Sequence, residues 1–409
     1  MLNAAVAVGL AFHLIRELFS PRELASTDFT VFRTGWSLIM HGRARELYDA
    51  SAQAAAQTAL LNQVGSHGFQ EGMMAFLHPP HAALAGCVFG WIAQRFGLSL
   101  AFWIWTAGSL ALLVYLVRLV RDELGGGPRV TALVAVTLAA FYPVLETLQE
   151  GQVSALLAVA ALALAISLRE GRTFSAACWL LALSIKPQTL PSLLVVLAVR
   201  RERRVLLVAA ALGAGVFLLT ALVLGGDVWW HYAASLPGLE RFFGVGTPDH
   251  MPTVRGLLTR LFGRGSQYRE AIDLLTLLAW VAAIVGAGFA AALSRPRRDG
   301  RAPLAFALAA GALASPHLFP QDVLLWVAPV TLVLSLSREE GEDVWRRRAR
   351  MVLSWPLWFV MARALDIRDT PQTHLPIDLM IIPLAIATVW AAREASRAGS
   401  MGAGQVSPY

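Results

Sequence analysis

Residues 174–199 read FSAACWLLALSIKPQTLPSLLVVLAV, and this stretch decides how the chain meets a membrane. Lys186-Pro187-Gln188 interrupts it and leaves an apolar arm of about 12 residues on either side. A helix that crosses the hydrocarbon core of a bilayer needs roughly 20 apolar residues, so neither arm spans it comfortably. The stretch therefore predicts a helical hairpin that enters the membrane and turns back, with Lys186 at its tip.

The rest of the chain shares this apolar character. Hydrophobic residues make up 56% of its 409 residues and charged residues 15%, against about 25% charged in soluble domains. This composition excludes soluble enzymes, disordered scaffolds and secreted disulfide modules. Apolar runs long enough to be considered as crossings lie at 2–19, 79–95, 100–118, 131–147, 152–168, 205–224, 271–293, 302–314, 322–337, 351–366 and 377–392. They predict an all-α polytopic membrane protein, a single membrane domain over 1–409 with about 11–13 transmembrane helices.

The formal net charge of +7 comes from arginines that cluster in short loops between the apolar runs. Such clusters mark the cytoplasmic side of a membrane protein, so the basic balance indicates orientation and not a nucleic-acid partner. Placing all of them in the cytoplasm is self-consistent from residue 169 onward, and it puts the hairpin tip outside. The five clusters are Arg169 with Arg172, the arginines of 200–204, those of 295–301, those of 346–350, and Arg393 with Arg397.

The number of predicted crossings before residue 169 does not fit this orientation, which is a parity problem for the N-terminal part. If 2–19 is an uncleaved crossing, 79–95 returns, and counting every later candidate as a full crossing puts Arg169 on the wrong side. One element between 79 and 168 must then be re-entrant or must fuse with its neighbour. We expect it near 131–151, where Pro143 and Gly151 interrupt the apolar pattern.

Two long segments, 20–78 and 225–270, are expected as extracytoplasmic loops, and loops of this kind usually carry the chemistry. Within the first, the alanine- and glutamine-rich run 50–63 is interpreted as an interfacial amphipathic helix. At the entrance of the second, Trp229, Trp230 and Tyr232 are interpreted as an interface anchor. The two cysteines, Cys87 and Cys178, lie in apolar stretches and are expected to be free thiols.

Asp28 follows the first apolar run within Ser-Thr-Asp-Phe. A carboxylate near low-dielectric surroundings has a raised pKa and can act as a general base. The alternative is that Asp28 caps a helix over 30–41 and satisfies its free backbone N–H groups.

Lys186 is the only lysine among the 34 Lys and Arg residues. A chain so biased to arginine keeps lysine where a compact ammonium matters, and a charge amid apolar sequence is costly. A lipid phosphate would suit that ammonium, and Gln188 is a substrate-binding candidate beside it. The alternative is a lysine whose ammonium snorkels to the membrane surface.

Further polar groups lie at breaks in the apolar pattern. His78-Pro79-Pro80-His81 opens a span, and both histidines could bind a sugar or phosphate or be ordinary interfacial residues. Gln152 could donate to a sugar hydroxyl or cap the following helix. His317, in Ser315-Pro316-His317 and followed by Asp322, lies where polar groups usually line a cavity, since bare backbone cannot face lipid.

Other sequence signals are weaker or absent. Asp249-His250 in the second long loop is a minor candidate. The sequence has no His/Cys set with zinc spacing, no P-loop, no Gly-x-Ser-x-Gly elbow and no Asp-x-Asp pair in the first loop. No bound metal is therefore expected.

Taken in order, these pieces resemble glycosyltransferase family 87, polyprenyl-phosphate-sugar-dependent membrane enzymes of the GT-C superfamily. The resemblance covers roughly 20–340. It rests on Asp28-Phe29, Gly42 to Leu47-Tyr48-Asp49, His78-Pro79-Pro80, Gly151-Gln152, Lys186-Pro187, the arginines of 200–204 and Ser315-Pro316-His317. His78 departs from the family's usual aromatic residue, and 247–252 departs from its usual Asn-x-Ser-like stretch, which puts the acceptor's identity in doubt.

The resemblance implies a GT-C-like helical bundle and an inverting transfer of a hexose, commonly mannose, from a polyprenyl phosphate to a lipid or glycan acceptor. It implies catalysis at the outer face of the plasma membrane without a cofactor. By position, Asp28 is the expected base, and Lys186 and His317 are expected donor-phosphate contacts.

Two other classes also fit the residues. A transporter or lipid flippase shares the many helices and the intramembrane charge, but the half-polar first loop and the absence of an internal repeat argue against it. A lipid-linked oligosaccharide ligase or polymerase is expected to carry arginine-rich outer loops, whereas the outer loops here hold scattered arginines only.

Overall fold

Most apolar runs of the sequence fold into helices that begin and end within a few residues of the predicted positions. The run 131–147 is broken into two helices, and the last two helices, 342–367 and 381–403, extend well beyond the predicted 351–366 and 377–392. The computed structural model describes residues 2–18, 27–63, 74–243, 250–263, 266–294, 300–367 and 379–403, and all regular secondary structure in these ranges is helical. The all-α polytopic membrane architecture is therefore confirmed. The free thiols of Cys87 and Cys178 are confirmed as well.

The first half of the chain forms α1 (Leu2–Leu18), α3 (Asp28–Met40), η1 (Ala44–Glu46), α4 (Ala50–Gln63), α5 (Pro80–Phe96), α6 (Leu98–Glu123), α7 (Pro128–Ala139), α8 (Tyr142–Gln149), α9 (Ser154–Arg169), α10 (Thr173–Leu183), η2 (Pro187–Thr189) and α11 (Leu190–Val199). The second half forms α12 (Arg203–Leu224), α13 (Val228–Phe243), α14 (Val254–Phe262), α15 (Ser266–Leu293), α16 (Arg301–Leu313), η4 (Pro320–Trp326), α17 (Val327–Glu340), α18 (Glu342–Ile367) and α19 (Ile381–Ala403).

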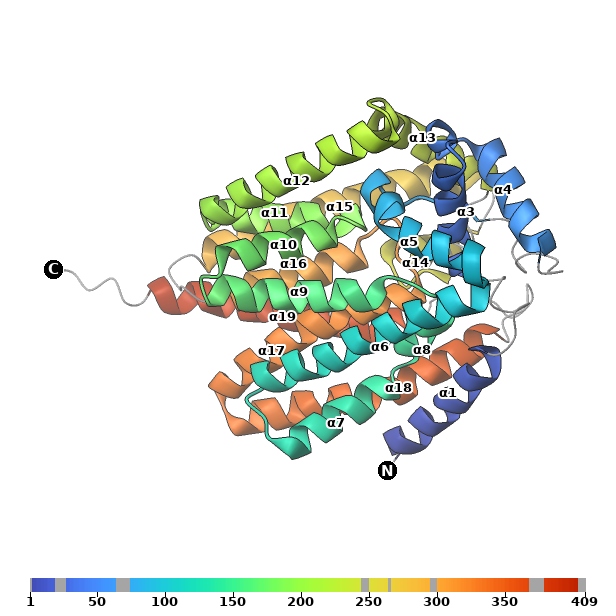
Figure 1. Ribbon diagram of the computed structural model, residues 1–409. Coiled ribbons are helices and arrows are strands. Elements are labelled where there is room, and N and C mark those ends of the chain that lie inside the picture. The colour runs from blue at the N-terminus through green and yellow to red at the C-terminus, as the bar shows by residue number, and fades with distance from the viewer. Residues whose placement is uncertain are drawn as a thin grey trace.

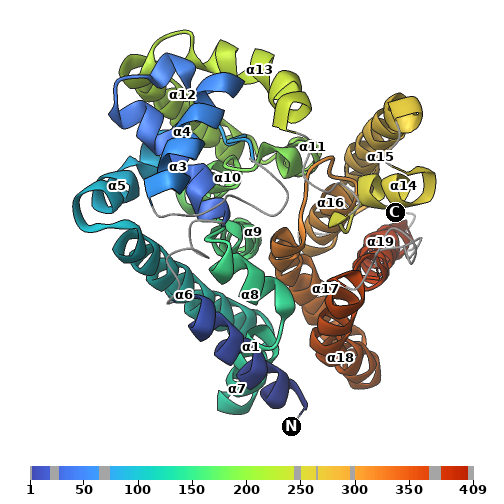
Figure 2. The same ribbon diagram turned by 90° about the vertical axis from the view of Figure 1, so that its right-hand side faces the viewer.

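Most of the long helices run side by side between two ends of the molecule (Figure 1). The arginine-rich turns lie at one end, here called the basic end, while α3, α4, α13 and α14 lie at the other, here called the loop end. Viewed from the loop end, α9 passes through the middle of the bundle, and nearly all of its residues are buried (Figure 2). The bundle is thus built around an alanine-rich central helix.

Ion pairs tie the basic clusters together. Arg169 lies 2.6 Å from Glu123, and Arg301 lies 3.7 Å from the same carboxylate. Arg348 pairs with Glu394 at 2.7 Å. The predicted grouping of the arginines at one end is therefore correct, although residues 295–299 of the third cluster lie outside the described ranges.

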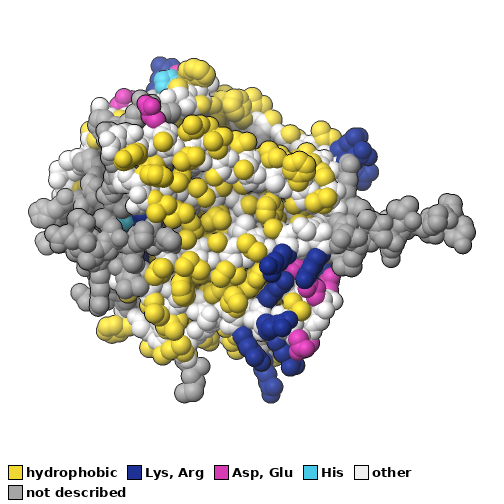
Figure 3. Space-filling model, turned by 180° about the vertical axis from the view of Figure 1, so that it is seen from behind, with side chains coloured by type: hydrophobic (Ala, Val, Ile, Leu, Met, Phe, Trp, Pro, Cys, Tyr) yellow, Lys and Arg dark blue, Asp and Glu magenta, His cyan; other side chains and the backbone are white. Residues whose placement is uncertain are grey.

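Length and apolar character identify the helices able to cross a bilayer. Among the described residues, four pass both criteria, namely Leu98–Glu123, Arg203–Leu224, Gln267–Leu293 and Pro320–Glu340. Two bent pairs pass when each is taken as a unit. One of these is α10 with η2 and α11, bent by 120° within the stretch 174–199 for which the hairpin was predicted. A broad face of the molecule is covered by hydrophobic side chains, as a membrane protein requires (Figure 3).

The expectation of a re-entrant element near 131–151 is wrong. Phe102 near the start of α6 packs on Phe29 at the loop end, while Glu123 at its other end belongs to the basic end. The next pair, α7 and α8, is bent by 61°. It nevertheless runs all the way back to the loop end, since Glu150 at its far end binds the backbone of Asp28. Pro143 opens α8 after the break, so the chain bends there without reversing.

The element that does not cross is α5. Near its start, His81 lies 3.2 Å from Ser184 of the hairpin, and at its end Gly97 joins it directly to α6 at the loop end. Figure 1 shows α5 beside α3 in the half of the molecule away from the basic end. This placement resolves the parity problem, because the chain from α3 to the start of α6 stays at the loop end.

The helix predicted over 50–63 exists as α4, but its interpretation as an interfacial amphipathic helix is wrong. The residues that it buries include two glutamines, Gln53 and Gln57, beside Ala52, Leu60 and Leu61, so its buried face is not a purely apolar one. The Gln53 amide donates to the Leu47 carbonyl at 2.8 Å and accepts from the Phe76 N–H at 2.8 Å. Gln57 makes the same kind of paired contact with the backbone of Met74, at 3.1 Å for each bond. α4 therefore anchors the extended segment that leads to His78.

The three residues predicted as an interface anchor, Trp229, Trp230 and Tyr232, do not all face outward. Trp230 is 73% exposed and is free to face lipid headgroups. Trp229 instead donates its indole N–H to the Thr220 hydroxyl at 2.8 Å, and Tyr232 packs on Tyr48. Only Trp230 is placed as an anchor, because the other two rings pack inward.

Candidate active site

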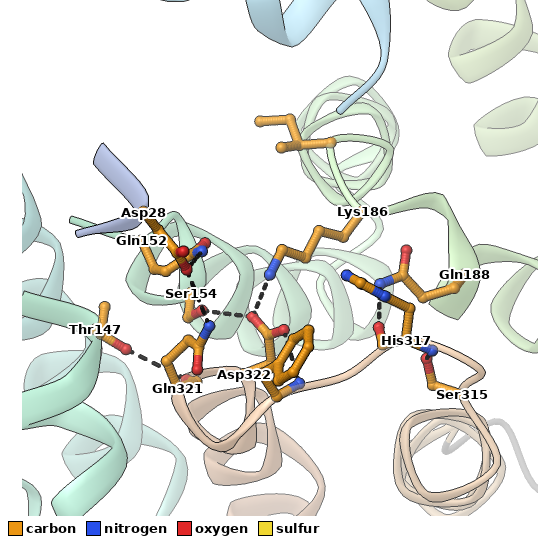
Figure 4. Close-up of polar contacts among 12 residues, drawn as sticks. Asp28, Thr147, Gln152, Ser154, Lys186, Gln188, Ser315, His317, Gln321 and Asp322 are labelled. Atoms are coloured by element: carbon orange, nitrogen blue, oxygen red, sulfur yellow. Dashed lines mark hydrogen bonds and ion pairs between the residues drawn. The ribbon is translucent and has the colours of Figure 1, made fainter. Parts of the chain in front are cut away.

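Asp28 is the first residue of α3, and it does not cap that helix. Thr27 occupies the N-cap position without a capping side-chain hydrogen bond, so the capping interpretation of Asp28 is wrong. The Asp28 carboxylate accepts hydrogen bonds from the side-chain amides of Gln152 and Gln321, the latter at 3.3 Å (Figure 4). Its own backbone N–H donates to the Glu150 carboxylate at 3.1 Å. Asp28 is therefore held by groups from two distant parts of the chain, the turn between α8 and α9 and the start of η4.

The turn between α8 and α9 brings Gln152 beneath Asp28. Gly151 adopts a φ of +66°, and a Cβ there would lie 2.9 Å from the Cβ of Phe29. Only glycine fits both the left-handed conformation and this close approach. The N-cap of α9 is Val153, so Gln152 does not cap the helix. Its amide N–H binds Asp28, while its carbonyl oxygen is buried without a donor among the described residues.

Lys186 lies at the tip of the hairpin and points into the protein. Its Nζ lies 2.5 Å from Oδ1 of Asp322, and the residue is only 9% exposed. Asp322 also accepts from the Ser154 hydroxyl at 2.7 Å and from the Phe319 N–H at 3.3 Å. The snorkelling alternative for Lys186 is therefore wrong, because its ammonium is buried in an ion pair.

The two charged centres belong to one cluster. Gln321 and Asp322 are neighbours in η4, and the first binds Asp28 while the second binds Lys186. Figure 4 shows the Asp28 carboxylate next to Gln321 and the Lys186 ammonium next to Asp322. The cluster holds two carboxylates against one ammonium, and Glu146 adds further negative charge nearby.

The pKa of the Asp28 carboxyl reflects this arrangement of charges. Burial raises the pKa of its carboxyl from 3.8 to about 6, with smaller upward contributions from Asp322 and Glu146. The Gln152 hydrogen bond and the Lys186 charge oppose this rise in pKa. A carboxyl with a pKa near 6 is ionised at neutral pH and still basic enough to take a proton.

His317 lies beside the ion pair in the segment between α16 and η4. Its carbonyl accepts from the Gln188 side chain at 2.8 Å, and the Gln188 carbonyl accepts from the Trp280 indole at 3.0 Å. Gln188 thus fastens this segment to the hairpin. The ring Nδ1 of His317 is buried without a partner among the described residues. Burial, followed by the Lys186 charge, lowers the pKa of His317 to about 4, so the ring is neutral.

His78 and His81 flank the hairpin tip on the other side. His78 stacks on Phe32, and its Nδ1 lies 3.4 Å from the Ile185 carbonyl. Burial, followed by the Lys186 charge, lowers the pKa of His78 to about 3. His81 stacks on Trp229 and binds the Ser184 hydroxyl, while its Nδ1 is another buried nitrogen without a partner in the described part of the chain.

All seven predicted site residues therefore gather around the hairpin tip. Three further residues, Gln321, Asp322 and Ser154, complete the connection between Asp28 and Lys186 and were not among the predicted site residues. The available signal was a carboxylate, Asp322, at the start of an apolar run, where an ionised group is costly unless it is paired or functional. Asp249 of the minor candidate pair lies outside the described residues.

Within the described ranges, no group of three or more His, Cys, Asp or Glu side chains could hold a metal ion. The charged groups of the cluster instead bind one another. The polar atoms left without partners are the carbonyl oxygen of Gln152 and one ring nitrogen each of His81 and His317. Buried polar atoms without partners are rare in native proteins and commonly mark a ligand or water position.

Comparison with known proteins identifies the class of protein that this fold and cluster define. The model of glycosyltransferase family 87 matches residues 76–320, more than half of the chain. The chain belongs to this family and is a multi-pass membrane glycosyltransferase. No curated protein and no solved structure matched in the corresponding searches. The matched range contains six of the seven predicted site residues, whereas Asp28 lies before it.

Proposed function

We propose that the protein transfers a hexose, in the first place mannose, from a polyprenyl phosphate to a lipid or glycan acceptor, with inversion at the anomeric carbon. The observation that carries the proposal is the convergence of the Asp28 carboxylate and the Lys186 ammonium on one buried cluster. A transferase of this kind needs a base for the acceptor and a cation for the leaving phosphate. The reaction uses no cofactor.

Asp28 is the proposed general base. The acceptor hydroxyl must lose its proton as it attacks the anomeric carbon through an oxocarbenium-like transition state. Gln152 and Gln321 hold one oxygen of the Asp28 carboxylate, which fixes its orientation. The pKa of about 6 keeps the carboxylate ionised at neutral pH and close to the value at which a base is most effective.

Lys186 is the proposed contact of the donor phosphate. A phosphate leaves without a general acid, so one carboxylate is sufficient for the transfer. Asp322, which also accepts from the Ser154 hydroxyl, holds the ammonium in the cluster, and a phosphate oxygen would add a second anion to the same cation. The neutral ring of His317 beside the pair offers one more buried nitrogen to that phosphate or to the sugar.

The unpartnered polar atoms support a sugar as the ligand. They include acceptors such as the Gln152 carbonyl oxygen, whose counterpart would be a hydroxyl donor. A hexose supplies several hydroxyl groups that can donate and accept within a small space. Placing such a ligand between Asp28 and Lys186 would satisfy these atoms and position the anomeric carbon between the base and the phosphate.

We place this reaction at the outer face of the plasma membrane. The support is the positive-inside rule, since the described arginine clusters lie at the end of the bundle opposite to α3 and α4. A donor lipid carrying its phosphate at headgroup depth would meet the hairpin tip from that outer side.

A transfer assay tests the proposal. Membranes containing the protein are incubated with radiolabelled polyprenyl phosphate mannose, polyprenyl phosphate glucose or a nucleotide sugar, together with a lipid extract as acceptor. We expect label to reach the acceptor from a polyprenyl phosphate sugar and not from the nucleotide sugar. Transfer from the nucleotide sugar alone would refute the lipid-linked donor.

A further inference from the structure

An apolar groove lies away from the candidate active site, between α6, α7, α17 and α18. Its volume is about 330 Å³. Leu133 and Leu138 of α7 form one wall, Val330 and Leu334 of α17 form the floor, and Val352 and Phe359 of α18 form the other wall. No step of the proposed transfer uses this space.

The two ends of the groove differ in charge. At the basic end its lining includes Arg346 and Arg350, both exposed residues of α18. Arg346 also pairs with Glu342 at 2.9 Å, but both partners of that pair are more than half exposed. Exposed pairs of this kind contribute little, so the arginine remains available to another anion. The opposite end of the groove is closed by Phe141 and Trp326.

A further polar group lies at the charged end. Trp345, next to Arg346, also lines the groove, and its indole N–H is buried without an acceptor among the described residues. A buried tryptophan N–H usually finds an acceptor, and tryptophan suits positions where an apolar slot meets polar headgroups. Ester and phosphate oxygens are acceptors of this type. The groove thus combines an apolar slot with two cations at its charged end, beside a tryptophan whose N–H has no acceptor among the described residues.

We propose that this groove binds one anionic glycerophospholipid of the leaflet at the basic end. Its acyl chain would lie along Leu133, Val330 and Phe359, and its phosphate would lie between Arg346, Arg350 and Trp345. The isoprenyl donor does not fit this site, since the donor phosphate belongs with Lys186 at the hairpin tip. The cations of the groove are at the opposite end of the bundle.

Lipid binding to the purified full-length protein tests the proposal. The probes are phosphatidylglycerol and phosphatidylcholine with identical acyl chains, titrated against the protein in detergent and counted as bound adducts by native mass spectrometry. We expect tighter binding of phosphatidylglycerol. Each arginine near an anionic headgroup should account for about fivefold in affinity, so Arg346→Gln with Arg350→Gln should lose roughly 25-fold. Phosphatidylcholine carries the same phosphate beside a compensating choline cation, so its weaker binding should fall by a smaller factor.

A charge-matched control is available at the same end of the molecule. Arg203→Gln with Arg204→Gln removes two exposed arginines from the start of α12, across the bundle from α18. This variant should keep the preference for phosphatidylglycerol. Equal binding of the two lipids by the wild type, or an equal loss in both double variants, would overturn the proposal.

Two further measurements test whether the apolar slot itself is needed for binding and whether an isoprenyl lipid occupies it. Ala349→Phe fills the groove without removing a charge, and it should weaken phosphatidylglycerol binding while the melting temperature without lipid reports on folding. Retained selectivity in a folded Ala349→Phe variant would show that the arginines act without the groove. Displacement of phosphatidylglycerol by undecaprenyl phosphate at equal concentration would assign the groove to an isoprenyl lipid. Either result refutes the proposed occupant.

Discussion

Two buried clusters of charge, one at each end of the bundle, differ in how their charges balance. At the basic end the Glu123 carboxylate is fully buried, and two arginines from other helices, Arg169 and Arg301, surround it. At the hairpin tip a single ammonium, Lys186, faces two carboxylates, Asp28 and Asp322. In the first cluster Arg301 also pairs with Glu339, so two arginines face two carboxylates, whereas the second cluster has excess negative charge in a buried position.

The cluster at the basic end has the properties of a structural ion pair, and the cluster at the hairpin tip has those of a chemical site. The arginines of the basic end join α6, α9 and α16, and their charges are satisfied within the protein. The cluster at the hairpin tip leaves a carboxylate with a raised pKa and three buried polar atoms without partners in the described part of the chain. An uncompensated buried cluster costs stability, and such a cost is usually retained only where it serves a function.

The sharpest test is to neutralise one carboxylate in the buried cluster. Asp28→Asn should lower sugar transfer by about 10²–10⁴-fold, because it removes the proposed base while keeping the shape of the side chain. Transfer is measured with the radiolabelled donor in membranes containing equal amounts of protein. Asp227→Asn, an exposed aspartate in the turn before α13, is the control and should keep full activity. Full activity of Asp28→Asn would remove the base assignment.

The Lys186–Asp322 pair should show the strong coupling of a buried ion pair. Lys186→Met and Asp322→Asn should each destabilise the protein by about 3–5 kcal/mol, because each leaves one buried charge unpaired. The double variant should recover much of this loss and still fail to transfer sugar. Thermal unfolding in detergent and the transfer assay measure the two effects. Strictly additive destabilisation would show that the pair is not coupled.

Glu123 should affect stability without affecting chemistry. Glu123→Gln leaves Arg169 and Arg301 without their shared carboxylate, but Arg169 is 40% exposed and can turn to water. We therefore expect a smaller loss of about 1–3 kcal/mol in unfolding free energy. The rate of transfer per folded molecule should stay normal. A specific loss of transfer in a fully folded variant would contradict the structural role.

The smallest expected effect is a pH dependence that distinguishes the clusters. Since the pKa of Asp28 is about 6, transfer should rise up to that pH and level off above it, falling about tenfold per unit below. A flat rate between pH 5 and 8 would exclude Asp28 as the base.

Ionisation of the same carboxyl should also change the stability of the protein. Stability should fall as the pH rises, whereas the rate of transfer should increase. The pKa of this carboxyl is raised on folding from 3.8 to about 6, so its stabilising contribution is complete below pH 3.8 and is lost as the pH rises through 6. The melting temperature of Asp28→Asn minus that of the wild type should therefore be higher at pH 8 than at pH 5. Glu123→Gln is the control, and a gain of the same size in that variant would show that the effect does not belong to Asp28.

Local sequence was sufficient to predict the helices and several members of the site. The interruption at Lys186-Pro187-Gln188 predicted the hairpin because neither apolar arm can cross a bilayer. The course of α5 was not predictable in the same way, since its apolar run resembles that of a crossing helix. Its position depends on packing against α3 and on the contact of His81 with Ser184.

The pairing of the charges also required the fold. Asp322 is 136 residues from Lys186, and Gln321 is 293 residues from Asp28. Local patterns carry no information on contacts across such separations, so the sequence could place each group near the outer surface but could not join them. The same holds for α4, whose glutamines look like surface residues until their partners, the backbone groups of Met74 and Phe76, are known.

By itself the sequence determined that the chain is a helical membrane protein, that its arginines gather on one side, and that Lys186 lies at a break. These properties follow from hydropathy and local geometry, which act within a few turns of helix. Only the tertiary structure decided that Asp28 and Lys186 share a cluster through Gln321 and Asp322, because η4 packs between α8 and α9. Packing of distant elements, and not local preference, sets the charge balance there.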